Sequence, residues 1–144
     1  MIAISSTEIE YLEENIMKRA AFYYRAAVVE AGTEGIYRIW ADMITNCISD
    51  CTVNVETDVF FDANVSGLTN MTERKGFNQL LKQLDAEKYD VVITNNFCRL
   101  SRNMNIFMDM LSEIFSRGCE IRFIEEGVGF NNMEQFIRYM YLMR

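Results

Sequence analysis

Histidine is absent from the 144-residue sequence, and its absence excludes several kinds of chemistry. The commonest general base is missing, and so are the Ser-His and Cys-His pairs that activate nucleophiles. A zinc site built from cysteine and histidine is excluded for the same reason. The cysteines are dispersed along the chain, at Cys47, Cys51, Cys98 and Cys119. We interpret them as reduced thiols of a cytoplasmic protein, and we expect neither a metal nor a cofactor.

Long apolar runs and a surplus of positive charge are also lacking. No apolar run reaches the length of a membrane span, and the glutamate-rich N-terminus lacks the basic region of a secretory signal. The formal net charge of −7 is unfavourable for a protein that holds nucleic acid alone, although it permits a local basic site. Half of the residues are hydrophobic, which suits one globular domain over residues 1–144.

The sequence does contain a regular alternation of strand and helix patterns. Thr72 and Asn132 are placed to cap helices, and Gly118 is placed to end one. Strands are predicted at 20–25, 53–61, 89–94 and 120–124, and helices at 7–18, 36–48, 73–86, 103–117 and from 133 onward. This alternation predicts a single three-layer α/β domain, with a mostly parallel sheet of four to five strands and helices on both faces.

Residues 89–103 join a buried strand to two arginines. The apolar run at 91–93 is typical of a strand buried on both faces, and Arg99 and Arg102 follow it. Ligands of open α/β sheets bind beyond the carboxyl ends of the strands, and a guanidinium matches phosphate in a bidentate way. The alternative is a set of surface ion pairs. Arginines also follow or end the neighbouring strands, so four of them can converge at one edge: Arg25, Arg74, Arg99 and Arg102.

These arginines lie in segments that resemble the catalytic domain of the serine recombinases, the resolvases and invertases. The segments occur in the family's order at Tyr23 to Ala27, Asp62 to Gly67, Thr72 to Phe77, Cys98 to Asn103 and Ile121 to Val128. In that family a serine attacks a DNA phosphate and stays linked to it, without a metal, while arginines stabilise the phosphoryl charge. The resemblance implies this role for Arg25, Arg74, Arg99 and Arg102, and loop support from Asp62, Ser66 and Ser101.

Two positions depart from the family's pattern. Ala27 occupies the nucleophile position, and a methyl group cannot attack phosphorus, so covalent catalysis is predicted to be lost. Cys98 occupies a position that is acidic in many members and serine in some. Among other groups that could attack, Ser66 and Ser101 are expected to turn or cap their loops, and Cys98 is expected to be buried and inert.

The C-terminal segment, 132–144, resembles the start of the family's long oligomerisation helix, and an extra N-terminal helix is predicted within 1–18. The family continues into a DNA-binding domain, for which no motif is found here, so binding to the DNA phosphate backbone is expected to be weak. An apolar stripe on the last helix predicts a homo-oligomer or a hetero-oligomer with a related recombinase through 133–144; the alternative is that it closes the core. The stripe contains Met133, Phe136, Ile137, Met140 and Tyr141.

Three hypotheses about function follow. The first is a recombinase-like protein that has lost cleavage and acts by assembly with recombinase partners in mobile-element DNA recombination. The second is a truncated catalytic domain of an active recombinase, carrying alanine in place of serine. The third and remotest is a receiver-like signalling domain, in which Asn95 stands where the phosphorylated aspartate belongs.

Overall fold

The structure is a computed structural model that describes residues 18–26, 53–86 and 88–143. The helices predicted at 7–18 and 36–48 lie outside the described residues, apart from Lys18, which begins a strand. Ala27, the position of the missing nucleophile, also lies outside them. None of the helices in the described ranges is long and apolar enough to cross a membrane.

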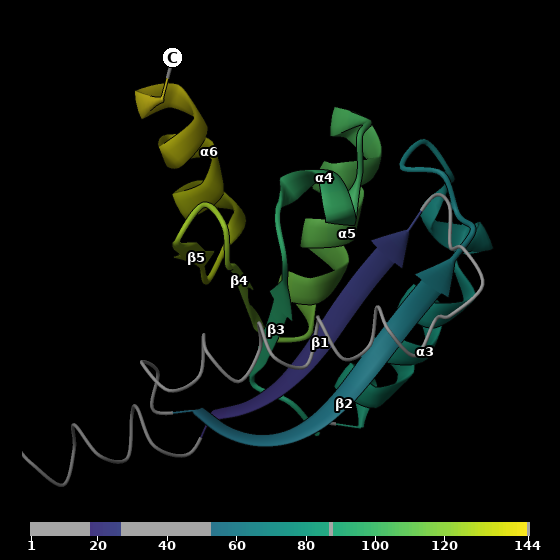
Figure 1. Ribbon diagram of the computed structural model, residues 1–144. Helices are drawn as coiled ribbons and strands as arrows, with labels where there is room; N and C mark the ends of the chain where they lie inside the picture. The colour runs from purple at the N-terminus through teal and green to yellow at the C-terminus, as the bar shows by residue number, and fades with distance from the viewer. Residues whose placement is uncertain (1–17, 27–52, 87, 144) are drawn as a thin grey trace, which may run out of the picture.

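Five strands form a single, mostly parallel sheet in the order β2-β1-β3-β4-β5 (Figure 1). The strands are β1 (Lys18–Ala26), β2 (Val53–Ala63), β3 (Val91–Thr94), β4 (Glu120–Phe123) and β5 (Val128–Phe130). β1 pairs in parallel with both β2 and β3, and β3 pairs in parallel with β4. β5 runs antiparallel to β4 after a tight turn at Gly127, whose positive φ of 66° suits glycine. The four predicted strands are confirmed, and β5 is the fifth strand among the described residues.

Within the ranges that the structure describes, the α-helices begin at asparagine caps, with one exception. They are α3 (Lys75–Asp85), α4 (Phe97–Leu100), α5 (Met104–Ser116) and α6 (Met133–Leu142), with a short 3-10 turn η1 at Met71–Glu73. The side chains of Asn96, Asn103 and Asn132 accept backbone N–H groups at the starts of α4, α5 and α6, which confirms the predicted cap at Asn132. Gly118 follows α5 with a φ of 76°, as expected for a helix end. The exception is α3.

The main core lies between one face of the sheet and the helices α3 and α5. Alternate residues of β1 show which face is which: Ala21 and Tyr23 face this core, whereas Ala20 and Phe22 belong to a second buried cluster on the opposite face. α6 stands apart from the body at the β5 side of the sheet (Figure 1). Only Phe136 of α6 is buried, so the helix is anchored to the core near its beginning.

Candidate anion site at the carboxyl ends of the strands

Three parallel strands end side by side and bring the predicted site residues together. Arg25 near the end of β1 lies opposite Asp62 near the end of β2. β3 ends at Thr94 and leads through α4 to Arg99, Ser101 and Arg102. The loop after β2 carries Ser66 and Gly67 and reaches the same edge. Residues that are far apart in the sequence therefore lie together at one edge of the sheet.

Arg25 is almost completely buried, with 1% of its surface exposed. Its Nη1 donates to the carbonyl of Val65 at 2.9 Å, and its Nη2 donates to the carbonyl of Cys98 at 2.6 Å. Its Nε is buried and has no hydrogen-bond partner. Burial lowers the pKa of Arg25 from its ordinary value, and the positive charge of Arg74 lowers it further, with smaller contributions from Arg99 and Arg102. All four arginines therefore share one electrostatic environment.

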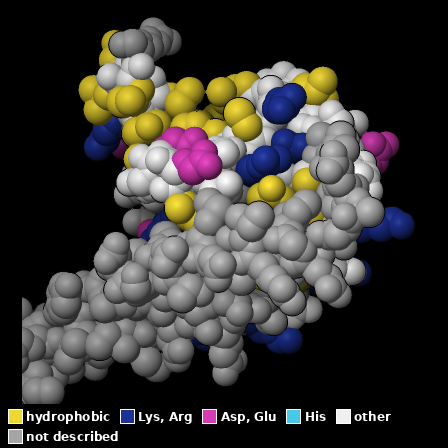
Figure 2. All heavy atoms as spheres, in the orientation of Figure 1, with side chains coloured by type: hydrophobic (Ala, Val, Ile, Leu, Met, Phe, Trp, Pro, Cys, Tyr) yellow, Lys and Arg dark blue, Asp and Glu magenta, His cyan; other side chains and the backbone are white. Residues whose placement is uncertain are grey.

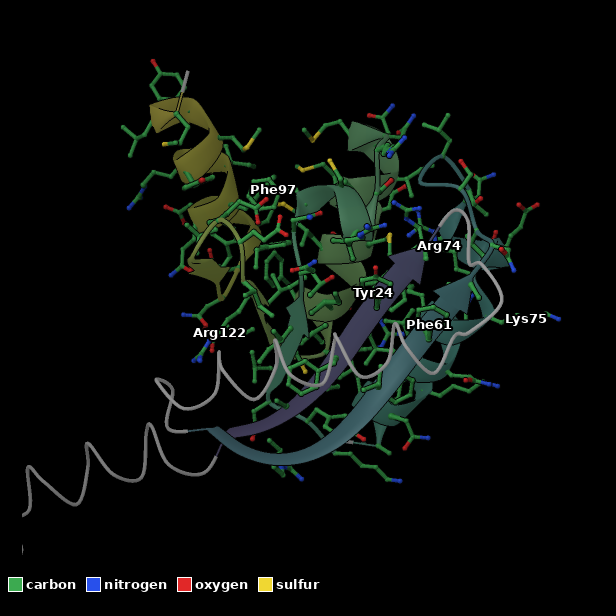
Figure 3. All side chains as sticks on the ribbon, in the orientation of Figure 1. Tyr24, Phe61, Arg74, Lys75, Phe97 and Arg122 are labelled. Carbon is green, nitrogen blue, oxygen red and sulfur yellow. The ribbon has the colours of Figure 1, made fainter. Side chains whose placement is uncertain are left out.

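Arg74 is fully enclosed, with none of its surface exposed. Its Nε donates to the carbonyl of Thr69 at 3.1 Å, and its Nη2 donates to the carbonyl of Gly67 at 3.4 Å. Its Nη1 donates to the carbonyl of Leu100 and to the hydroxyl of Tyr23, the latter at 3.5 Å. The guanidinium points into the loops at the end of β1 (Figure 3). Arg74 thus contacts protein acceptors on every nitrogen.

Asp62 provides the cap that α3 lacks in its own sequence. Its Oδ1 accepts the N–H of Gly76 at 2.7 Å, and its Oδ2 accepts the N–H of Phe77 at 3.0 Å. The hydroxyl of Tyr23 donates to the same Oδ2 at 2.7 Å. The prediction that Thr72 caps this helix is wrong, because α3 begins at Lys75 and the capping carboxylate comes from the neighbouring strand. Burial, and then the charge of Asp62, raise the pKa of Tyr23.

Arg99 and Arg102 form the outer part of the site. The Arg99 guanidinium lies 5.1 Å from the centre of the Tyr24 ring, and that ring stacks on Phe61 with a centroid distance of 5.4 Å. Arg102 is exposed, whereas Arg99 is half-buried and donates to the Arg25 carbonyl at 3.4 Å. Figure 2 shows basic side chains gathered near α4 at this edge. Among the described residues, none of the four site arginines forms an ion pair.

The loop residues Ser66, Ser101 and Cys98 differ in their surroundings. The Ser101 hydroxyl is buried and donates to the carbonyl of Gly67 at 2.8 Å. The hydroxyl of Ser66 is exposed and accepts the N–H of Leu68 at 3.1 Å, which is a local turn. Cys98 was expected to be buried, and this expectation is wrong: its side chain is exposed, while its carbonyl accepts from Arg25. The short helix α4 turns the side chain outward.

Two contributors to the site have no role in the sequence-based prediction. Tyr23 links Asp62 to Arg74, and Phe97 anchors the segment that carries Cys98 and Arg99. Phe97 lies between α4 and α6 (Figure 3) and meets Phe123 edge to face at 4.5 Å. The sequence does contain a signal for Tyr23, because the alternation along β1 places it on the same face as Arg25. Within the described ranges, no three acidic or sulfur side chains lie together as metal ligands.

Comparisons with known proteins agree with this geometry. The family described as resolvase, N-terminal domain, matches residues 20–143. The fold is similar to the N-terminal catalytic domain of TP901-1 integrase, with 20% identity, a TM-score of 0.69, and coverage of 88% of this chain and 92% of that one. A resolvase family site-specific recombinase from Streptococcus pneumoniae is similar at 15% identity and a TM-score of 0.65, with 88% and 85% covered.

A third similar structure is the C-terminal catalytic domain of ISC1926 TnpA, an IS607-like serine recombinase. It shares 22% identity with a TM-score of 0.59, and the match covers 87% of this chain and 79% of that one. No curated protein matches the chain. At these identities the solved structures show a common fold, and the family match rests on the sequence.

Proposed function

Because the chain belongs to the family of resolvase N-terminal domains, we propose that it is a serine-recombinase-like domain of mobile-element DNA recombination that holds DNA phosphate but does not cut it. The similar solved structures, which include an integrase domain and an IS607-like serine recombinase, support the link to site-specific recombination. The domain contributes to recombination by assembling with recombinase partners. Its own role is to bind the DNA phosphate and to position the DNA.

The observation that carries the proposal is the cluster of arginines that have no carboxylate partner among the described residues. Clustered positive charges repel one another and favour an added anion. Arg25 keeps a buried Nε without an acceptor, and Arg102 is exposed beside it in the same electrostatic cluster. A phosphodiester supplies the oxygens that such groups bind most strongly.

Binding to a short DNA duplex at low salt tests the phosphate site. Each phosphate contact contributes about one unit to the slope of log affinity against log salt concentration, so Arg102→Gln is expected to weaken binding and reduce that slope by about one. Arg117→Gln is the matched control, because Arg117 follows the far end of α5 and pairs with Asp85 and Glu113. Equal effects of the two substitutions would contradict a localised site.

The absence of a nucleophile supports the non-cleaving part of the proposal. Ala27 has no group that can attack phosphorus, so incubation with DNA followed by denaturing electrophoresis is expected to show no cut strand and no covalent adduct. An adduct would contradict the proposal and direct attention to the exposed Cys98 thiol.

The serine-to-alanine catalytic domain of an active recombinase is the second candidate, supported by the retained arginine cluster. Restoring the nucleophile separates the two hypotheses. Under the first, Ala27→Ser gives at most weak cleavage, because the surroundings of position 27 have changed as well: alanine at 26 and the residues that follow depart from the family pattern. Under the second, Ala27→Ser restores efficient cleavage. The family match leaves no observation that favours a receiver-like signalling domain.

Assembly is proposed to use the end of α6. Beyond Phe136, exposed apolar side chains dominate the helix: Ile137 is 54% exposed and Tyr141 is 69% exposed. Hydrophobic side chains gather there in Figure 2. Contiguous exposed apolar surface of this kind usually marks an interface with another protein. The partner is a second copy of this chain or a related recombinase.

A further inference from the structure

The geometry points to Arg74 as a positioning residue that sets the two loops of the phosphate site, and not as a ligand of the phosphate itself. This inference rests on the proposed function, because it assigns separate tasks to arginines that the family resemblance places in one group. Arg99 and Arg102 contact the anion, whereas Arg74 holds the backbone on which they are presented.

The donors of Arg74 are almost all used within the protein. A guanidinium has five N–H groups, and Arg74 uses four of them, on Thr69, Gly67, Leu100 and Tyr23. None of its surface is exposed, and it has no buried nitrogen without a partner. Because the group is fully enclosed, a phosphate could reach it only if the surrounding loops moved apart. Arg25 differs, because its Nε has no acceptor.

The acceptors of Arg74 come from two separate segments of the chain. Gly67 and Thr69 belong to the loop after β2, and Leu100 ends α4, so Arg74 joins two segments that are far apart in sequence. Arg102 lies where these segments meet. Its backbone N–H donates to the carbonyl of Gly67 at 3.0 Å, the same oxygen that Arg74 Nη2 contacts. A displacement of the Arg74 side chain is therefore expected to displace the backbone of Arg102.

The positive charge of Arg74 is buried and must be compensated within the protein. A buried arginine is costly unless its charge is compensated and its donors are satisfied. The Tyr23 hydroxyl accepts from Arg74 at 3.5 Å and donates to Asp62 at 2.7 Å, which brings a buried carboxylate into the same network. Asp62 in turn fixes the start of α3, immediately after Arg74. The guanidinium is thus held from both sides, as a positioning group requires.

Arginine and lysine differ in the shape of their charged groups, so substitution by lysine should have different effects at positions 74 and 102. Lysine keeps the charge but has three donors on one nitrogen, and it cannot reach acceptors spread around a planar fork. At Arg102, which is exposed, lysine can still meet phosphate as a point charge. Arg74→Lys should therefore behave like Arg74→Met, whereas Arg102→Lys should recover most of the binding.

The first experiment uses the unaltered protein, labelled with ¹⁵N, and follows the arginine Nε–Hε signals while inorganic phosphate is added. Shifts of Arg99 and Arg102, with a slowly exchanging and unshifted Arg74 signal, are the expected result. A phosphate-induced shift of Arg74 comparable to that of Arg102 would overturn the inference and leave the phosphate site in place. If none of the arginine signals shifts, the proposed function is overturned, and the inference with it.

The second experiment measures affinity for a short DNA duplex at a temperature where every variant is folded by circular dichroism. Arg74→Lys and Arg74→Met are each expected to lose affinity about tenfold, and Arg102→Lys about threefold or less. The backbone amide signals of Gly67 and Arg102 should shift in Arg74→Lys. Recovery of binding by Arg74→Lys, with those signals unchanged, would overturn the inference. If the Arg74 variants do not fold, the phosphate titration of the unaltered protein decides.

Discussion

The carbonyl oxygen of Gly67 accepts hydrogen bonds from three residues of the site. The Ser101 hydroxyl donates to it at 2.8 Å, the Arg102 N–H at 3.0 Å and the Arg74 guanidinium at 3.4 Å. The residue must also be small, because a Cβ at position 67 would lie 2.6 Å from Cγ of Arg102. A single backbone position therefore sets how closely the loop after β2 approaches the arginine segment.

Gly67→Ala is expected to displace the stem of Arg102. Overpacking of this kind costs about 1–3 kcal/mol in the free energy of unfolding, and the displaced guanidinium should weaken binding to a DNA duplex. Gly129→Ala is the control, because Gly129 lies on β5, away from the site, and its new Cβ would meet Cγ of Arg122 on β4 at 3.1 Å. Urea unfolding and duplex binding measure the two effects. Unchanged duplex binding in Gly67→Ala would show that the position of the Arg102 stem does not matter.

The two described cysteines should respond differently to thiol reagents, and the buried one should make stability depend on pH. Burial raises the pKa of Cys119 to about 11, from an ordinary value of 9.0, whereas Cys98 is exposed. The thiol form of Cys119 is therefore favoured by folding, and its contribution to stability is present below pH 9 and lost as pH rises towards 11. Cys119→Ala should flatten the fall of stability over that range.

Labelling with iodoacetamide at pH 8, with the modified peptides mapped by mass spectrometry, tests the same contrast. Cys98 should react in the folded protein, and Cys119 should react only after unfolding. Rapid modification of Cys119 without loss of structure would contradict its burial beneath the Tyr89 carbonyl, to which its Sγ donates at 3.2 Å.

At the scale of elements, α3 shows how a helix can take its cap from another strand. Asp62 accepts two backbone N–H groups of α3 and the hydroxyl of Tyr23, so Asp62→Ala leaves three donors without their acceptor. Loss of a cap costs about 1 kcal/mol and buried donors add to it, so we expect a loss of about 2–4 kcal/mol in the free energy of unfolding.

Thr72→Ala is the matched control for Asp62→Ala. Thr72 is exposed and does not cap α3, so this change should alter the free energy of unfolding by less than about 0.5 kcal/mol. Denaturant unfolding of both variants decides between the two caps. A larger loss for Thr72→Ala than for Asp62→Ala would restore the local cap that the sequence suggests.

The elements that the sequence predicts well are those that carry their own signal. The apolar run at 91–93 and the periodic apolar faces of α5 and α6 are local, and each gave the correct element. α4 has four residues and β5 has three, which is too short for any period. α4 is stabilised by residues outside it: Phe123 packs against its first residue, Phe97, and the carboxylate of Glu126 accepts the N–H of Phe97 at 3.2 Å.

The sequence predicts which arginines meet at this edge of the sheet, but it does not predict how deeply each of them is buried. The resemblance to serine recombinases selected all four arginines, and the structure brings their segments to one edge of the sheet. The burial of Arg25 and Arg74, and the exposure of Arg102, depend on which carbonyls the folded loops present. Such carbonyls leave no signal in a sequence, because every residue has one.

At the scale of the whole molecule, α6 is held to the core mainly near its beginning, where Phe136 is its one buried residue. Phe136, which the sequence places in the apolar stripe, is 2% exposed and packs in the core. The exposed part runs through Ile137, Met140 and Tyr141 on one side of the helix. A hollow of about 130 Å³ lies beside it, where Met140 and Phe136 face the start of α5 and Arg102. The apolar surface therefore adjoins the candidate anion site.

Self-association through this surface can be tested without disturbing the core. Sedimentation velocity over a range of concentrations is expected to show a dimer or larger assembly for the unaltered chain, and Ile137→Glu should shift it towards monomer, because a buried charge in the interface has no partner. Leu68→Glu is the matched control, since Leu68 is 63% exposed and lies in the loop after β2, away from α6. Both variants should keep the thermal stability of the parent, because neither side chain is in the core. If the chain stays monomeric at high concentration and Ile137→Glu changes nothing, α6 does not pair with a second copy, and mixing with a related recombinase then tests the remaining partner.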